Sequence, residues 1–223
     1  MKILALETSG DFCSVALWRD GVIEERELPA EQRQSGLLLD MVHELLVSCE
    51  VTLKDVTGIA FGAGPGAFTG LRVACGVTQG LALGADKPVV AVNTLQALAE
   101  GCGAERVVCC VDARMREVYQ AAYQQRDGGW ACVQQAGVYA PDAVPPLPGP
   151  DWIGCGSGFA VYRQVLQTRY GAQLAAINEN LHVRARDIAA LAAPVFARGG
   201  GCAADQVAPI YVRDKVALMS HER

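Results

Sequence analysis

The order of strand and helix patterns along this chain occurs twice, once in each half. Short apolar runs predict strands, and apolar residues that recur every three or four positions predict helices. The first half has three strands, then a helix, a strand, a helix, a strand and a helix. The segments are KILALETS, FCSVALWRDG, VIEERELP, SGLLLDMVHELLVSC, GIAFGAGPG, FTGLRVACGVTQGLALG, KPVVAV and TLQALAEG. Gly10-Asp11 and Asp20-Gly21 supply turns between the first three strands, which are therefore expected to form an antiparallel meander.

The second half repeats this order with one exception. RVVCCVDAR, REVYQAAYQQ and WACVQQAGVYA predict three strands, and WIGCGSG, FAVYRQVLQTRYG, QLAAIN and DIAALAAPVFARGGG predict a strand, a helix, a strand and a helix. The last helix is expected to end or kink near Pro194. The segment PDAVPPLPGP, residues 141–150, replaces the first helix of the repeat. Its five prolines prevent a helix, so it is expected to be an extended surface linker.

This repeat predicts an α/β protein of two similar lobes, each with a mixed sheet flanked by helices. The expected division is residues 1–101 and 102–223. Actin, the Hsp70 ATPase lobe and the sugar kinases share this architecture, so the actin-like class is the predicted fold.

Helix ends are predicted from capping residues. Ser35 and Thr94 are expected to cap the starts of their helices, because their hydroxyls can accept backbone N–H groups. Gly84 and Gly101 are expected to end the helices that precede them.

The formal net charge, 19 − 24 = −5, argues against a protein that binds nucleic acid alone. Neither a signal peptide nor a membrane span is expected, because Glu7 soon interrupts the first apolar stretch and no apolar run reaches about 18 residues. The nine cysteines lack C-x-x-C spacing and lie mostly in apolar runs. This pattern favours buried, reduced thiols in a cytoplasmic protein over a zinc site or a catalytic thiol.

The segment FGAGPGAFTGLR places Gly62, Gly64, Gly66 and Gly70 between a strand and a helix. Glycine lets a backbone approach a phosphate closely, and a helix N-terminus attracts anions. The P-loop signature is absent, because no Lys-Ser or Lys-Thr follows the last glycine. Two interpretations stay open: a tight strand-to-helix turn, or an anion site.

The LETSGDFCS hairpin is a second candidate site. In the actin-like architecture the first hairpin faces nucleotide phosphate, and a carboxylate at its start holds the metal through water. Glu7 stands at that position, with Thr8 and Ser9 beside it. The alternative is a polar strand end at a turn.

Gly76, Gly80 and Gly84 recur every four residues in the helix after the glycine loop. Each interior glycine costs about 0.8–1 kcal/mol relative to alanine, so packing must compensate. Two interpretations stay open: close contact with the chain's own sheet, or a helix–helix interface with another chain. The leucine-rich helix at residues 37–46 would join that interface.

The segment DARMREVY follows a strand and places Asp112, Arg114, Arg116 and Glu117 in one turn between the lobes. This turn is interpreted either as a solvated one or as a functional one. The three histidines lack H-x-x-x-H and H-E-x-x-H spacing, so no histidine metal site is expected. G-x-S-x-G is absent, and no nucleophile–base pair is evident.

Four segments strongly resemble the bacterial TsaB (YeaZ) family: ILALETSGDFCSVAL, GAGPGAFTGLRVACGVTQGLALG, VDARMREVYQAAY and PIYVRDKVA. They follow the family's order over nearly the whole chain, and GPGAFTGLR together with DARMREVY is highly specific. The resemblance implies an actin-like (ASKHA, ribonuclease H-like) fold. It also implies a role in making N6-threonylcarbamoyladenosine at position 37 of tRNAs that read ANN codons.

In that family the chain resembles a non-catalytic paralogue of TsaD, the subunit that transfers the threonylcarbamoyl group to tRNA. The resemblance implies pairing with TsaD through helices of the N-terminal lobes, recruitment of the ATPase TsaE, and a homodimer when alone. It implies contact with tRNA mainly through the complex, and ATP with Mg²⁺ only weakly or within the complex. The expected interface residues are Leu37, Leu38, Met41, Val42, Leu45, Arg72, Val73, Gly76, Val77, Gly80, Leu81 and Gly84. The candidate anion-binding residues are Glu7, Thr8, Ser9, Gly64, Gly66 and Asp112.

The chain departs from the family at two positions, with Glu7 where Asp is usual and Gln34 where His is frequent. The alternative function is a stand-alone ATPase or kinase-like enzyme that uses Glu7 and the glycine loop. A glycopeptidase, the older label for relatives, would need metal ligands or a nucleophile that the sequence does not offer. Leu38→Glu and Gly80→Leu are each expected to abolish pairing while leaving the fold largely intact.

Overall fold

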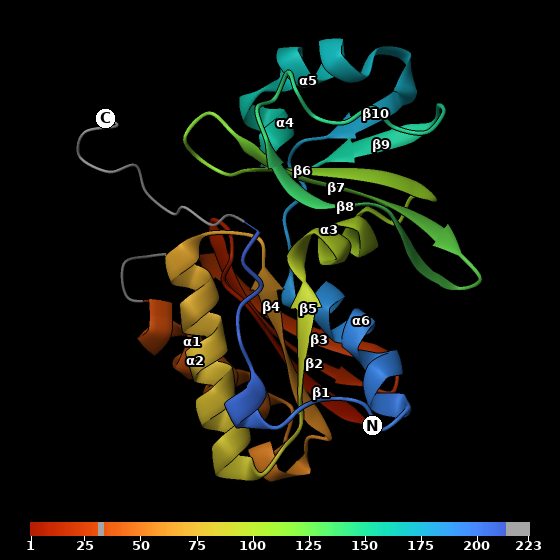
Figure 1. Cartoon of the computed structure of the whole chain (residues 1–223). Helices are drawn as coiled ribbons and strands as arrows, with labels where there is room; N and C mark the ends of the chain where they lie inside the picture. The colour runs from red at the N-terminus through yellow and green to blue at the C-terminus, as the bar shows by residue number, and fades with distance from the viewer. Residues whose placement is uncertain (31–33, 213–223) are drawn as a thin grey trace.

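The computed structural model describes residues 1–30 and 34–212, without the side chains of Gln34 and Ser35, and shows two five-stranded sheets covered by helices (Figure 1). The first sheet has the order β3-β2-β1-β4-β5. Its strands are β1 (Lys2–Glu7), β2 (Phe12–Arg19), β3 (Val22–Pro29), β4 (Gly58–Gly64) and β5 (Val89–Asn93). The first three form the predicted antiparallel meander, and β4 and β5 run parallel to β1.

The second sheet repeats the first. Its order is β10-β9-β6-β7-β8, with β6, β7 and β8 antiparallel and β9 and β10 parallel to β6. Its strands are β6 (Arg106–Asp112), β7 (Val118–Arg126), β8 (Gly129–Tyr139), β9 (Trp152–Cys155) and β10 (Leu174–Asn178). The prediction of an α/β protein with two similar lobes in the actin-like arrangement is therefore confirmed.

The helices are close to those predicted, with two differences at their interruptions. They are α1 (Gln34–Ser48), α2 (Phe68–Ala85), α3 (Thr94–Cys102), α4 (Ser157–Val161), α5 (Arg163–Tyr170) and α6 (Ala185–Ala197), with 3-10 turns η1 (Leu53–Asp55), η2 (Gly171–Gln173) and η3 (Ala204–Gln206). The segment FAVYRQVLQTRYG forms two helices that meet at Tyr162 rather than one. α6 continues through Pro194 as far as Ala197.

The N-terminus of α3 is capped by Asn93 rather than by the predicted Thr94. The Asn93 side chain accepts hydrogen bonds from the backbone N–H groups of Leu95, at 2.9 Å, and Gln96, at 3.2 Å. The Thr94 hydroxyl instead donates to the Pro65 carbonyl and ties α3 to the glycine loop. An amide oxygen one residue earlier reaches the free N–H groups, which leaves the threonine available for this contact. The cap predicted at Ser35 lies outside the described side chains.

Both predicted glycine stops lie inside their helices. α2 continues past Gly84 to Ala85 and is capped by Asp86, which has a φ of 53°. α3 continues past Gly101 to Cys102 and is capped by Gly103, which has a φ of 67°. These two residues adopt the left-handed conformation that closes many helices. The sequence alone could not tell which of two nearby turn-forming residues adopts it.

α6 packs on the first sheet although it follows the second sheet in the sequence (Figure 1). Ile188 and Ala192 share one buried cluster with Ile3, Ala5 and Ala60, on the face of the sheet opposite α1 and α2. Alanines on both sides of this contact let the helix approach the sheet closely. The first sheet is therefore covered on both faces, once by helices that precede β5 and once by a helix near residue 190.

α3 packs in the opposite sense, from the first repeat onto the second sheet. Leu95 and Leu98 pack with Cys109 and Ala121 of the second sheet, although α3 belongs to the first repeat. The division at residues 101 and 102 remains a prediction, and the packing links the two halves through both α3 and α6.

The proline-rich segment at residues 141–150 has no helix, as predicted, but it is more than a surface linker. Val144 and Leu147 are buried and share a cluster with Trp152 and Phe159. These apolar side chains between the prolines cover the second sheet where a helix covers the first.

Six of the nine cysteines are buried, and Cys132 is exposed. Within the part of the chain that the structure describes, no helix combines the length and hydropathy needed to cross a bilayer.

Candidate functional site

The glycine stripe of α2 faces solvent. A Cβ atom added at Gly76, Gly80 or Gly84 would meet no atom within 4 Å. The side of α2 that packs on the first sheet carries other residues, among them Ala74 and Ala82. The structure therefore excludes the interpretation that the glycines allow close contact with the chain's own sheet.

Four of the expected interface residues of α1 lie in the core instead of on the surface. Leu38, Met41, Val42 and Leu45 are at most 3% exposed and pack against the first sheet. None of the four side chains can touch a partner unless that core opens.

The outer side of α1 carries a different set of apolar side chains. Leu39 is 46% exposed and Val47 is 61% exposed, with His43 one helical turn from each. The sequence did not identify Leu39, His43 and Val47 as surface residues. Their spacing of four residues is typical of one helix face, but three consecutive leucines, residues 37–39, do not show which of them points outward.

We call the exposed surface of the two helices the helix-pair face. It consists of Leu39, His43 and Val47 of α1 and Arg72, Gly76, Gly80, Leu83 and Gly84 of α2. Leu83 is 78% exposed. The remaining expected interface residues are half-buried against the core: Leu37, Val73, Val77 and Leu81.

The helix-pair face is energetically unfavourable in an isolated chain. Three exposed glycines lower the helix propensity of α2 by about 2–3 kcal/mol in total relative to alanine, and Leu39, Val47 and Leu83 expose apolar surface to water. A helix laid across glycines can approach the backbone of α2 closely. The face thus has the composition of a surface covered by another helix.

A cleft of about 740 Å³ separates the two lobes. Its lining includes the β1–β2 turn at residues 9–12, the glycine loop and the start of α2 at 65–70, the β6–β7 turn at 111–115, the start of α4 at 156–157 and the connection at 179–183. Of the candidate anion-binding residues, Ser9, Gly66 and Asp112 line the cleft, whereas Glu7, Thr8 and Gly64 do not.

The glycine loop packs against the chain's own first hairpin. A Cβ at Gly62 would lie 1.6 Å from Glu7 Oε2, and one at Gly70 would lie 1.8 Å from the Thr8 carbonyl oxygen. At Gly66 the nearest hairpin atom would be 2.6 Å away. Gly62, Gly66 and Gly70 therefore make room for the hairpin, which supports the strand-to-helix turn. Residues 65–70 still line the cleft, so the anion site stays a prediction.

Glu7 is buried and does not face the cleft. Its Oε1 accepts a hydrogen bond from the Ser9 backbone N–H, and its Oε2 has no partner among the described residues. Burial raises the pKa of the Glu7 carboxyl from 4.5 to about 7, and the hydrogen bonds from Ser9 lower it only in part. Across residues 1–30 and 34–212, no three His, Cys, Asp or Glu side chains gather to hold a metal ion.

The free energy of unfolding is expected to fall as pH rises from 4.5 to 8. The folded chain holds the Glu7 proton up to about pH 7, whereas the unfolded chain releases it near pH 4.5. A folded-state pKa raised in this way favours the folded chain at low pH, by about 3 kcal/mol over this interval. Glu7→Gln should remove this contribution to the fall in the free energy of unfolding, which urea unfolding at pH 4.5 and at pH 8 would measure. Asp187, whose pKa burial also raises to about 7, retains its own share, and Asp187→Asn is the matched control. An unchanged pH dependence in Glu7→Gln would contradict the assignment.

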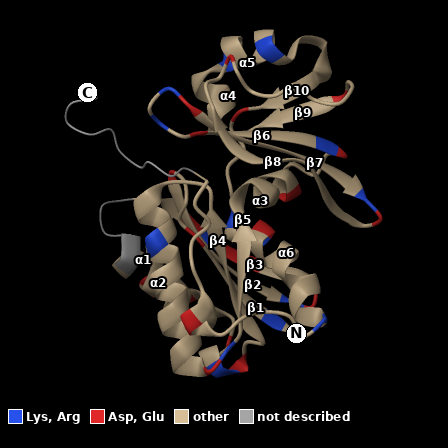
Figure 2. Cartoon of the chain, viewed as in Figure 1, with Lys and Arg blue, Asp and Glu red and all other residues tan. Residues whose placement is uncertain are grey.

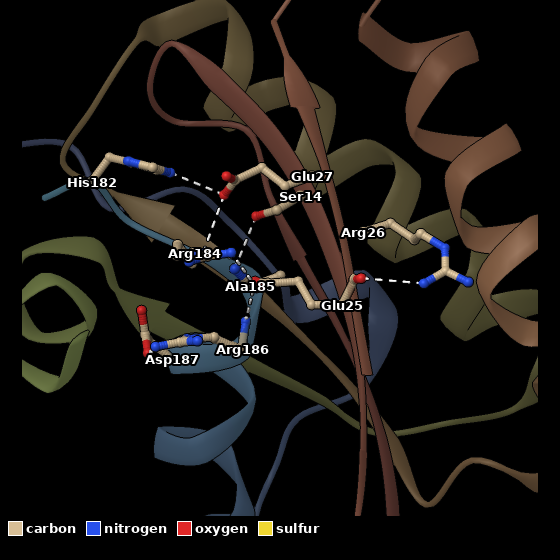
Figure 3. Close-up of polar contacts among 9 residues, drawn as sticks. All are labelled: Ser14, Glu25, Arg26, Glu27, His182, Arg184, Ala185, Arg186 and Asp187. Carbon is tan, nitrogen blue, oxygen red and sulfur yellow. Dashed lines mark hydrogen bonds and ion pairs between the residues drawn. The ribbon is translucent and has the colours of Figure 1, made fainter. Parts of the chain in front are cut away.

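The chain passes back from the second lobe to the first at residues 179–184, between β10 and α6. Ion pairs and hydrogen bonds hold this connection against the edge strand β3 (Figure 3). Arg184 pairs with Glu25 at 2.8 Å and with Glu27 at 3.3 Å, and His182 Nε2 lies 2.9 Å from Glu27 Oε2. Glu25 Oε1 also accepts the Arg186 backbone N–H at 3.1 Å. β3 thus caps the start of α6, where no residue of the helix itself provides a cap.

His182, at the start of this contact with β3, also reaches the cleft. The His182 ring stacks on the Phe12 ring with centroids 4.3 Å apart, and both residues line the cleft. The same connection therefore anchors α6 and forms part of the cleft wall.

The β6–β7 turn has an unusual backbone. Arg114, Met115 and Arg116 have φ values of 59°, 54° and 60°. Three successive residues other than glycine in the left-handed region cost about 1–2 kcal/mol each. The sequence predicts a turn here but not its left-handed backbone, because the segment contains no glycine, asparagine or proline.

Asp112 holds the turn in place. Its carboxylate accepts the Arg114 backbone N–H at 3.0 Å and pairs with the Arg114 guanidinium at 3.2 Å. The Asp112 backbone N–H donates to Ser157 Oγ at 3.1 Å, which ties the turn to α4. Asp112 thus braces the turn, while the Arg114 side chain remains 81% exposed.

Comparison with known proteins gives consistent matches over nearly the whole chain. The family model described as "TsaD: tRNA N6-adenosine threonylcarbamoyltransferase" matches residues 28–220. The tRNA threonylcarbamoyladenosine biosynthesis protein TsaB of Escherichia coli is 35% identical, covering 97% of this chain and 96% of that protein. The protein of the same name from Haemophilus influenzae is 33% identical, covering 97% and 95%. The structure of YeaZ from Pseudomonas aeruginosa is 39% identical with a TM-score of 0.85, covering 94% of this chain and 99% of that one. The chain therefore belongs to the TsaB (YeaZ) family, within the wider TsaD family whose model it matches.

Proposed function

We propose that this protein takes part in threonylcarbamoyladenosine biosynthesis on tRNA as a structural subunit that pairs with a TsaD protein through the helix-pair face. The relatives' names supply the pathway. The observation that carries the pairing is the outward glycine stripe of α2, flanked by exposed Leu39, Val47 and Leu83. In an isolated chain the glycines and the exposed apolar side chains only lower stability. A helix packed against α2 would bury the apolar side chains and compensate for the low helix propensity of the glycines.

TsaD is the partner that the family match supports. The TsaD model extends over residues 28–220 and so includes both α1 and α2. A protein with equivalent helices can pair like with like about an approximate twofold axis, as identical subunits do in a homodimer. When no TsaD is available, a second copy of this chain can cover the same face. The proposed homodimer and the proposed heterodimer therefore exclude each other.

A catalytic role for this subunit receives no support from its own residues. The glycines of the loop make room for the first hairpin, Glu7 is turned inward, and Asp112 braces its own turn. We assign the transfer chemistry to TsaD, and we assign to this subunit the support of TsaD and the recruitment of TsaE. With a net charge of −5, the chain would contact tRNA mainly through the complex, in the cytoplasm.

Omission of this chain from a reconstituted reaction is expected to abolish formation of threonylcarbamoyladenosine. The reaction would contain TsaD and TsaE of the same genome, tRNA, and the threonylcarbamoyl adenylate. Modified nucleoside would be measured by mass spectrometry after tRNA digestion, and light scattering would follow the change from homodimer to heteromer.

Equal product formation with and without the chain would contradict the proposal. Turnover of ATP by the isolated chain, lost in Glu7→Ala, would support the stand-alone enzyme instead. As a control, this chain without TsaD should give no product.

A further inference from the structure

The β6–β7 turn presents charge rigidly at the surface. Arg114, Met115 and Arg116 are all exposed, and the left-handed backbone is braced by Asp112. The Arg116 side chain extends from this braced turn into solvent. Strained backbone of this kind persists only where surrounding contacts enforce it, and it concentrates at sites of recognition.

The turn lies across the cleft from the start of α2, the helix that carries part of the helix-pair face. Residues from the start of α2, Phe68 and Thr69, line the same cleft as Arg114 and Met115. Arg72 lies one helical turn further along α2, with its guanidinium 3.8 Å from the Phe68 ring centroid. Figure 2 shows the turn projecting from the second lobe on the same side of the view as α1 and α2. The cleft thus lies between the basic turn of one lobe and the start of α2 in the other.

We propose that the partner covering the helix-pair face also spans the cleft and places carboxylates against Arg114 and Arg116. This inference rests on the proposed function and adds a second contact point, on the other lobe. One partner bound to both lobes would fix their relative orientation, because it would contact both sides of the cleft.

The composition of the turn favours an acidic protein surface over RNA. An exposed methionine between two arginines is a composition enriched in protein–protein interfaces. The contact belongs to the polar rim, where charge acts mainly on the rate of association.

The test is the rate of association with TsaD, measured at low and high salt for Arg116→Glu. This side chain is exposed, so the fold should be unchanged. The association rate constant is expected to fall by about fivefold to tenfold at low salt and to lose most of its salt dependence. The matched control is Arg126→Glu, which reverses an exposed arginine at the far end of β7.

A second variant separates recognition from stability. Met115→Gly relieves the left-handed strain and should raise the melting temperature of the isolated chain by about 3 °C. It should also weaken pairing with TsaD, because the turn is no longer rigid and the methionine is lost. A turn with only a structural role would gain stability without any loss of binding.

The outcomes distinguish this inference from the proposed function. If Arg116→Glu associates at the wild-type rate while Gly80→Leu does not pair, the second contact point is wrong and the proposed function stands. If neither variant loses pairing, both are wrong. If Arg116→Glu pairs normally but the assembled complex binds tRNA less tightly, the turn contacts RNA and the proposal is overturned.

Discussion

Replacement of Gly80 by leucine is expected to abolish association with TsaD and with a second copy of this chain, while it stabilises the isolated chain. A side chain at this position meets no atom within 4 Å, so the fold accepts it. Leucine has a higher helix propensity than glycine, and the isolated chain should gain about 0.5–1 kcal/mol of unfolding free energy. The same side chain holds a partner helix away from the α2 backbone. Light scattering would report association, and urea unfolding of dilute, monomeric chain would report stability.

Gln167→Leu is the matched control, because it adds the same side chain to an exposed position of α5, away from the helix-pair face. It should leave association unchanged. A Gly80→Leu chain that still pairs with normal affinity would show that the interface lies elsewhere. Loss of both pairing and folded structure would show that α2 is less tolerant than its open surroundings indicate.

Leu38→Glu and Leu39→Glu are expected to have opposite consequences, although the two residues are neighbours. Leu38 is fully buried between α1 and the first sheet, so a carboxylate there would lose its hydration without a partner. The cost of several kcal/mol is comparable with the whole stability of a typical domain, about 5–15 kcal/mol. Leu38→Glu should therefore unfold the chain, contrary to the expectation from sequence that its fold would survive.

Leu39→Glu should keep the fold and lose association. Leu39 is 46% exposed on the helix-pair face, and a charge there would be buried only when a partner binds. Circular dichroism and light scattering on both variants separate the two effects. A folded Leu38→Glu, or a Leu39→Glu that still pairs normally, would contradict the orientation of α1.

The strands and their repeated order could be predicted because most of them are short, almost entirely apolar runs. In such strands successive side chains point to opposite faces of the sheet, and here both faces are buried. In β1, Leu4 and Leu6 pack towards α1 and α2, and Ile3 and Ala5 pack towards α6. The orientation of α1 could not be predicted in the same way. Leu37, Leu38 and Leu39 are consecutive, and identical residues cannot show which one faces the core.

The glycines of the candidate site were ambiguous for a different reason. A glycine makes room for whatever approaches it, and the sequence does not say whether that is a phosphate, a partner helix or the chain itself. Around Gly62 and Gly70 the occupant is the first hairpin, and around Gly80 the space is open. Only distances between segments far apart in the sequence separate these cases.

The placement of α6 has a consequence for how this chain is made on the ribosome. The face of the first sheet formed by Ile3, Ala5 and Ala60 emerges early, but its cover, residues 185–197, is among the later segments to be synthesised. Until then this apolar face remains open to solvent or to a chaperone. The nascent first lobe is thus complete in its strands long before it can fold stably, and its maturation waits for a helix encoded beyond the whole second sheet.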